Sequence, residues 1–219
     1  MTAGARAPKF RLVFFDVDST LVTIEGIDWL AGGNPEVAKL TEAAMKGDIP
    51  LDQVYARRLE MIRPDREAID ALGRQYVASL VDGASETIEQ LRAKGIHIHL
   101  VTAGIEQAIA PLAARLGIPR ANVHAVALRF GANGEYAGFD ERSPLARPGG
   151  KEIVVRETRA RADGRAAFVG DGVSDLEAKP AVDLFIGFGG VQVRERVKEN
   201  ADVFIAARDL RAVVPHLLG

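Results

Sequence analysis

The sequence contains no cysteine, which excludes both a disulfide framework and a thiolate metal site. A chain without disulfides is compatible with a reducing compartment, so we expect a cytoplasmic protein. It also has no apolar stretch long enough to cross a bilayer. Residues 1–9 are small and polar and lack the apolar core of a secretory signal. Neither membrane insertion nor secretion is therefore predicted.

An excess of positive charge is also missing. The 28 Lys and Arg residues nearly balance the 30 Asp and Glu residues, so no basic surface recommends nucleic acid or a membrane as partner. Neither nucleic acid nor a membrane is therefore expected as a partner, and the oligomeric state is left as monomer or homodimer. The 219 residues suit one α/β domain with a substantial insertion, or two small domains.

Short apolar runs alternate with helical patterns over most of the chain, which predicts an α/β fold with a Rossmann-like parallel sheet. Active sites of such folds lie beyond the carboxyl ends of the strands. The predicted strands are residues 10–17, 96–101, 166–169, 183–187 and 202–206, and the predicted helices between and after them are residues 84–94, 106–116, 151–162, 191–199 and 210–218.

Residues 26–80 break this alternation because they are helical throughout, with helices expected at 34–46, 51–62 and 66–80. We interpret residues 23–80 as a helical cap domain inserted after the first strand, and residues 1–22 and 81–219 as the core domain. A second irregularity, residues 123–139, resembles a β-hairpin with Asn133-Gly134 at its turn.

Asp16 and Asp18 follow the first apolar run. Residues i and i+2 of a strand face the same side, roughly 6–7 Å apart. Two such carboxylates repel each other unless a cation or strong donors lie between them, and Mg²⁺ suits all-oxygen ligands. Alone, the pair is equally compatible with an Asp cap of the following turn, assisted by Ser19 and Thr20.

A second acidic pair, Asp171 and Asp175, lies in a Gly-Asp-Gly segment that also follows an apolar strand. By itself this segment fits a turn and a helix N-terminus. Four carboxylates at one edge of a sheet, however, are hard to explain without metal and phosphate. Thr102, which follows another strand, and Lys151, at a predicted helix start, supply a hydroxyl and a cation for a phosphate group.

These residues resemble, in order, the four motifs of the haloacid dehalogenase superfamily. Within it the chain is similar to phosphoserine phosphatases from about Phe10 to its end. The further stretches that carry this likeness are Glu25-Gly26-Ile27-Asp28, Ala44-Met45, Arg58-Leu59, residues 133–140 and residues 185–190.

The resemblance implies a phosphoric monoester hydrolase that uses Mg²⁺ and an aspartyl-phosphate intermediate to hydrolyse O-phospho-L-serine in serine biosynthesis. Asp16 would be the nucleophile and Asp18 the general acid–base. Asp16, Asp171, Asp175 and the backbone carbonyl of Asp18 would hold the metal. Thr102, Ala103, Gly104, Lys151 and Ser174 would bind the phosphate end of the substrate.

For the rest of the substrate, the resemblance implies that Glu25 takes the ammonium, Arg58 the carboxylate, and Met45 lines the pocket, with Arg194 also on this side. From the sequence alone Glu25 and Arg58 read as solvated helix charges. The chain departs from the family pattern at four positions, which are Lys46, Leu51, Ala103 and Ser174. Of these, Lys46 and Leu51 bear on substrate choice.

Several alternatives stay open at this level. Another phosphomonoester could be the substrate, or the phosphoryl group could pass to an alcohol such as homoserine. A receiver domain also clusters Asp, Thr and Lys around Mg²⁺, although it lacks a helical insertion, and a catalytically inactive binding module is a third reading. His97 and His99 have a spacing that could bind metal, but we expect packed or edge histidines.

Overall fold

The computed structural model describes residues 8–46, 48–49 and 51–219, apart from the side chains of residues 44, 45, 51 and 52. Its centre is a six-stranded parallel sheet in the order β3-β2-β1-β6-β7-β8. The strands are β1 Leu12–Phe15, β2 His97–Ile105, β3 Val123–Val126, β6 Ala166–Gly170, β7 Leu184–Phe188 and β8 Val203–Ile205.

β1 lies in the middle of the sheet, between β2 and β6. All residues of β1 and β6 are buried, which shows that both faces of the sheet are covered. The covering helices are α5 Ala84–Ala93, α6 Glu106–Arg115, α7 Gly150–Arg159, α8 Val173–Leu176, α9 Glu195–Asn200 and α10 Val214–Leu218, with short 3₁₀ turns at Arg120–Asn122, Pro144–Ala146, Lys179–Ala181 and Leu210–Val213. The predicted α/β, Rossmann-like fold is confirmed.

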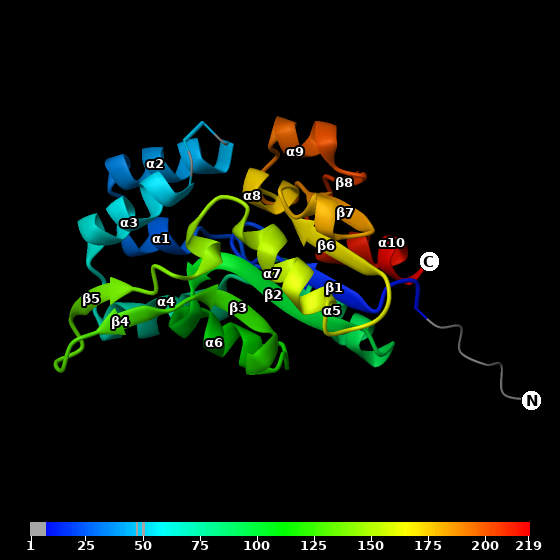
Figure 1. Cartoon of the computed structure of the whole chain (residues 1–219), viewed down its shortest axis with the longest axis horizontal. Coiled ribbons are helices and arrows are strands. Elements are labelled where there is room, and N and C mark those ends of the chain that lie inside the picture. The colour runs from blue at the N-terminus through cyan, green and yellow to red at the C-terminus, as the bar shows by residue number, and fades with distance from the viewer. Residues whose placement is uncertain (1–7, 47, 50) are drawn as a thin grey trace, which may run out of the picture.

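Four helices separate β1 from β2: α1 Gly26–Leu30, α2 Pro35–Lys46, α3 Leu51–Ile62 and α4 Arg66–Ala78. Figure 1 shows α1, α2 and α3 gathered at one end of the sheet. α4 packs along α6, where the absence of a side chain at Gly73 allows close contact with Pro111. The two ends of this helical segment lie side by side, because Val22 and Leu80 form an antiparallel bridge. In the described part of the chain no helix is long and apolar enough to span a membrane.

The predicted hairpin with Asn133-Gly134 at its turn is present, but its extent was wrong. Residues 123–139 are not a single hairpin, because Val123–Val126 joins the edge of the main sheet as β3, parallel to β2. The hairpin is shorter and consists of β4 Leu128–Phe130 and β5 Tyr136–Phe139. Its turn contains Gly134 at φ 85°, a conformation that favours glycine.

Several boundaries also differ from the sequence prediction, three of them more than the rest. β2 continues to Ile105 instead of ending at residue 101, because Ile105 still pairs with Val126. The helix expected over 191–199 begins only at Glu195. The C-terminal helix expected over 210–218 is divided into a 3₁₀ turn and α10.

Candidate active site

The carboxyl ends of β1 and β6 bring two acidic motifs together. Asp16 directly follows β1, and its backbone N–H donates to the carbonyl of Val169 in β6 (3.0 Å). Asp171 directly follows β6, and Asp175 lies in the short helix α8 after it. All three side chains are buried (Asp16 3%, Asp171 1% and Asp175 0% exposed). Pairing of neighbouring parallel strands therefore places residues far apart in the sequence at one edge of the sheet.

Asp16, Asp171 and Asp175 form a carboxylate cluster, with one oxygen of each within 4.8 Å of the others. Burial, followed by the neighbouring acids Glu25, Asp175 and Asp16, raises the pKa of Asp171 well above its usual range. Burial and Asp16 raise the pKa of Asp175 to about 6. Three buried carboxylates that converge in this way, two of them with a raised pKa, fit a hard divalent cation with oxygen ligands.

Lys151 supplies one positive charge to this cluster from α7. Its Nζ donates to Asp16 Oδ1 at 2.7 Å and also to Asp175 Oδ1. Burial works against the charged lysine, yet Asp16 and Asp175 raise the pKa of Lys151 above its ordinary value. The preceding glycine is required for this placement, since a Cβ at Gly150 would lie 1.9 Å from the carbonyl oxygen of Pro144.

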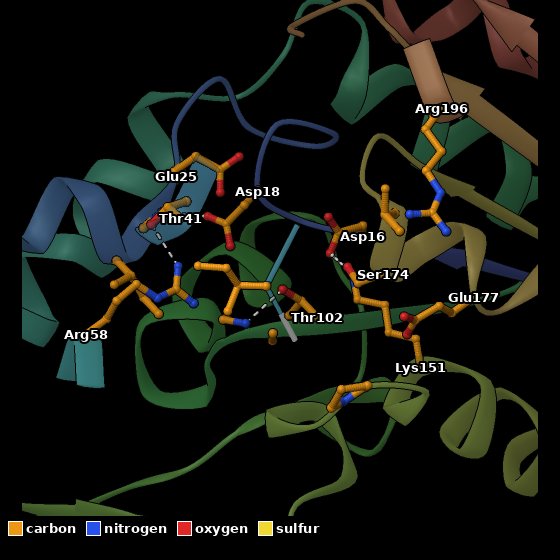
Figure 2. A pocket seen from close by; sticks show the side chains of 17 residues that line it. Asp16, Asp18, Glu25, Thr41, Arg58, Thr102, Lys151, Ser174, Glu177 and Arg196 are labelled. Atoms are coloured by element: carbon orange, nitrogen blue, oxygen red, sulfur yellow. Dashed lines mark hydrogen bonds and ion pairs between the residues drawn. The ribbon is translucent and has the colours of Figure 1, made fainter. Parts of the chain in front are cut away.

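The side chain of Asp18 is not part of the carboxylate cluster, and Figure 2 shows it on the side of Glu25 and away from Asp16. Its Oδ1 accepts hydrogen bonds from the Gly26 N–H at 2.8 Å and from the Tyr76 hydroxyl at 2.9 Å. Burial, and then the charge of Asp16, raise the pKa of Asp18 to about 7. A carboxyl group with this pKa can both give and take a proton near neutral pH.

Thr102 and Gly104 lie in the irregular last part of β2 and line the same cavity as Asp16 and Asp18. The Gly104 N–H donates to Thr102 Oγ1 at 2.9 Å, and Thr102 is almost fully buried. A Cβ at position 104 would lie 3.3 Å from Asp18 Oδ2, so glycine keeps the space beside Asp18 open. This part of β2, Lys151 and Asp16 line a cavity of about 290 Å³, a size that suits a small metabolite.

One side of the site is formed by Glu25 and Arg58, which come from the helical segment, together with Arg194, which directly precedes α9. Glu25 accepts from Ser19 Oγ at 2.6 Å and lies 3.6 Å from Arg194 Nη2. Burial, and then Asp18, raise the pKa of Glu25 to about 8. Arg194 Nε donates to Asp171 Oδ2 at 3.0 Å, so this arginine joins Glu25 to the carboxylate cluster.

The structure brings most of the predicted site residues to one cavity. Asp171 and Asp175 lie beside it in the carboxylate cluster, and Arg194 lines an adjoining cleft. The side chains of Met45 and Leu51 lie outside the described residues. The cavity itself is lined by the predicted residues Asp16, Asp18, Glu25, Arg58, Thr102, Ala103, Gly104, Lys151 and Ser174.

The sequence prediction missed several residues. Thr41, Glu177 and Arg196 also line the cavity, and Tyr76 contacts Asp18. Lys46, a departure from the family pattern, pairs instead with Glu42 and lines the adjoining cleft. For Thr41 and Tyr76 the sequence carries no local signal, because both reach the site through the packing of helices.

The two histidines singled out by their spacing take no part in this site. His99 is buried, and its Nδ1 lies 3.2 Å from Nε2 of His124 in β3. His97 is exposed at the start of β2. The prediction of packed or edge histidines is therefore confirmed.

Comparison with known protein families shows that residues 10–183 match the haloacid dehalogenase-like hydrolases. The chain is 40% identical over 197 residues to phosphoserine phosphatase of Bos taurus, covering 88% of each chain. It is 43% identical over 199 residues to the chloroplastic phosphoserine phosphatase of Arabidopsis thaliana, covering 88% of this chain and 68% of the relative.

Solved structures show the same similarity in three dimensions. A phospho-aspartyl intermediate analogue of phosphoserine phosphatase superposes with a TM-score of 0.83 at 28% identity, over 95% of this chain and 99% of the other. A substrate-bound phosphoserine phosphatase complex superposes with a TM-score of 0.82 at 27% identity, over 94% and 98%.

Proposed function

Because the chain belongs to the haloacid dehalogenase-like hydrolases, we propose that it is a phosphoserine phosphatase, which hydrolyses O-phospho-L-serine to L-serine and phosphate in serine biosynthesis. The observation that carries this proposal is one cavity in which Asp16 and Asp18 face Arg58 and Glu25. The first pair suits phosphoryl transfer, and the second pair suits the carboxylate and ammonium of an amino acid.

In the proposed reaction, a carboxylate oxygen of Asp16 attacks phosphorus, and the bond from phosphorus to the serine oxygen breaks. Asp18 gives its proton to the leaving alkoxide, for which a pKa of about 7 is suitable. Asp18 then takes a proton from water as the water attacks the aspartyl phosphate, which releases phosphate and regenerates Asp16. Lys151, Thr102 and the N–H groups after Thr102 bind the phosphoryl oxygens.

We propose Mg²⁺ as the metal of this site. Asp16, Asp171 and Asp175 would hold it, because their buried oxygens converge and burial raises the pKa of Asp171 and Asp175. The backbone carbonyl of Asp18 would be a further ligand, whereas its side chain is engaged by Gly26 and Tyr76. When bound, the ion would offset the negative charge of phosphate and nucleophile.

The helical segment, residues 23–80, is proposed as a cap over the core formed by residues 1–22 and 81–219. It contributes Glu25 and Arg58 to the cavity, so substrate choice would reside in the cap and phosphoryl transfer in the core. We propose a cytoplasmic location and a monomeric or homodimeric state. Size-exclusion chromatography with light scattering distinguishes the monomer from the homodimer.

A panel of phosphomonoesters assayed with Mg²⁺ tests the function. It contains O-phosphoserine, O-phosphothreonine, O-phosphoethanolamine, p-nitrophenyl phosphate and phosphorylated sugars. We expect O-phosphoserine to have the highest kcat/KM, with many turnovers per site. When homoserine is added as an alternative acceptor, the phosphoryl group should still be transferred to water and released as phosphate. A better substrate elsewhere in the panel overturns the substrate assignment, and a single stoichiometric phosphorylation overturns the hydrolase.

A further inference from the structure

Arg58, in α3, is a buried cation without a carboxylate in direct contact among the described residues. Its side chain is only 5% exposed, and Nη1 donates to Thr41 Oγ1 at 2.8 Å. Its Nε is buried and has no hydrogen-bond partner in that part of the chain. A buried guanidinium with unused donors has the capacity to bind an anion that enters the cavity.

The partner of Arg58 is itself part of a chain of hydrogen bonds. Thr41 Oγ1, in α2, donates to Asp28 Oδ1, in α1, at 2.5 Å. A hydroxyl has one proton to donate, so with that proton directed to Asp28 its lone pairs accept from Arg58. Asp28, Thr41 and Arg58 thus connect three helices, and Thr41 and Arg58 both line the cavity (Figure 2).

We propose that Thr41 and Asp28 are positioning residues, which fix one nitrogen of Arg58 so that the remaining donors receive the substrate's carboxylate. This inference rests on the proposed function, which assigns that carboxylate to Arg58. An arginine side chain has many rotamers, and ordering them before the substrate arrives reduces the entropy lost on binding. Asp28 acts indirectly, through Thr41. Its negative charge makes Thr41 Oγ1 a stronger hydrogen-bond acceptor for Arg58.

Thr41→Val tests the arrangement because it removes the hydroxyl with little change in shape, and Thr41→Ser is the matched control that keeps it. For O-phosphoserine we expect Thr41→Val to raise KM about 10-fold, the usual effect of losing a hydrogen bond to a charged group, with kcat within about threefold. For O-phosphoethanolamine, which lacks the carboxylate, kcat/KM should stay within about twofold. Thr41→Ser should resemble the wild type for both substrates.

Two further variants separate positioning from a general structural effect. Asp28→Asn keeps an acceptor but removes the charge, and we expect a smaller rise in KM, about threefold, again only for O-phosphoserine. In an Arg58→Lys background, Thr41→Val should add no further loss. Equal losses for the two substrates, or an additive loss in the Arg58→Lys background, would overturn the inference.

Failure of the proposed function is visible separately in the wild type. If another carboxylate-bearing phosphomonoester proves to be the better substrate, the phosphoserine assignment fails, and the positioning role is measured with that compound instead. If the wild type turns over no carboxylate-bearing phosphomonoester, both the function and the positioning role are overturned.

Discussion

Lys151 Nζ lies 2.7 Å from Asp16 Oδ1, although 135 residues separate the two in the chain. Both side chains are about 95% buried, since their exposed fractions are 5% and 4%. Breaking such a pair by removing one partner leaves a buried charge without compensation, at a cost of about 3–5 kcal/mol. The contact therefore fixes the start of α7 against the end of β1 and aims one carboxylate oxygen of Asp16.

Replacing this carboxylate tests the nucleophile. We expect Asp16→Asn to lower kcat for O-phosphoserine by at least about 10³-fold, because a neutral amide does not form the acyl phosphate. The fold should persist, since Lys151 still contacts Asp175. Steady-state phosphate release and thermal unfolding measure the two effects. Asp163→Asn, an exposed change far along the chain, is the matched control; activity that survives Asp16→Asn would refute the assignment.

Removal of the metal should have two consequences. Dialysis against a chelator should abolish turnover, and added Mg²⁺ should restore it. Mg²⁺ at 100 times its Kd should also stabilise the fold by about 2.7 kcal/mol, because it binds the folded state alone. In Asp171→Asn, which lacks one cluster carboxylate, the stabilisation measured by thermal unfolding should shrink. Full activity in the chelated enzyme would contradict a metal-dependent mechanism.

Tyr76→Phe tests the hydrogen bond that orients Asp18. Loss of the hydroxyl removes one of the two donors to Asp18 Oδ1, and we expect kcat to fall about 3–10-fold. Tyr55→Phe provides a matched control, because its buried hydroxyl has no hydrogen-bond partner among the described residues. We expect that change to leave kcat unaltered. Similar losses in the two variants would show that the effect does not pass through Asp18.

The contact between His99 and His124 predicts a pH-dependent contribution to stability. Burial, and then His124, lower the pKa of His99 from 6.5 to about 4. The unfolded chain therefore binds a proton at His99 near pH 6.5, whereas the folded chain does so only near pH 4. Stability from this group is lost as the pH falls through that window, by on the order of 2 kcal/mol after allowance for partial solvation.

Urea unfolding at pH 7.5, 6 and 5 gives the free energy of unfolding of wild type and of His99→Gln. The difference between the two proteins isolates the contribution of His99, because the other groups titrate in both. The fall of stability with acid should be smaller in His99→Gln. His216→Gln, an exposed change in α10, should keep the wild-type pH dependence. Identical pH profiles for wild type and His99→Gln would disprove the role of the pair.

The carboxylate cluster could be predicted because each of its motifs is marked in the sequence by the apolar strand that precedes it. Asp16 and Asp171 each directly follow a buried strand, and a parallel sheet places such positions at the same edge. The resemblance to a known family added Glu25 and Arg58, which the sequence alone would have left as solvated charges. Both residues are found at the cavity.

The parts that could not be predicted depend on tertiary packing. Thr41 and Tyr76 come from helices whose rotation about their own axes is decided by neighbouring helices, so no spacing in the sequence marks them. Val123–Val126 was mistaken for one arm of a hairpin because a short apolar strand does not reveal its partner. Its true pairing required β2 to extend to Ile105.

The bridge between Val22 and Leu80 has a consequence for how such an enzyme can diversify. Because the inserted helices leave the sheet and return to it at adjacent points, residues can be added to or deleted from them without moving these ends. The register of β1 beside β2 and β6 is then preserved, so Asp16 keeps its place, and Asp18 does so wherever Gly26 and Tyr76 are retained. Selection can therefore change the accepted substrate through this segment while the phosphate chemistry is inherited unaltered.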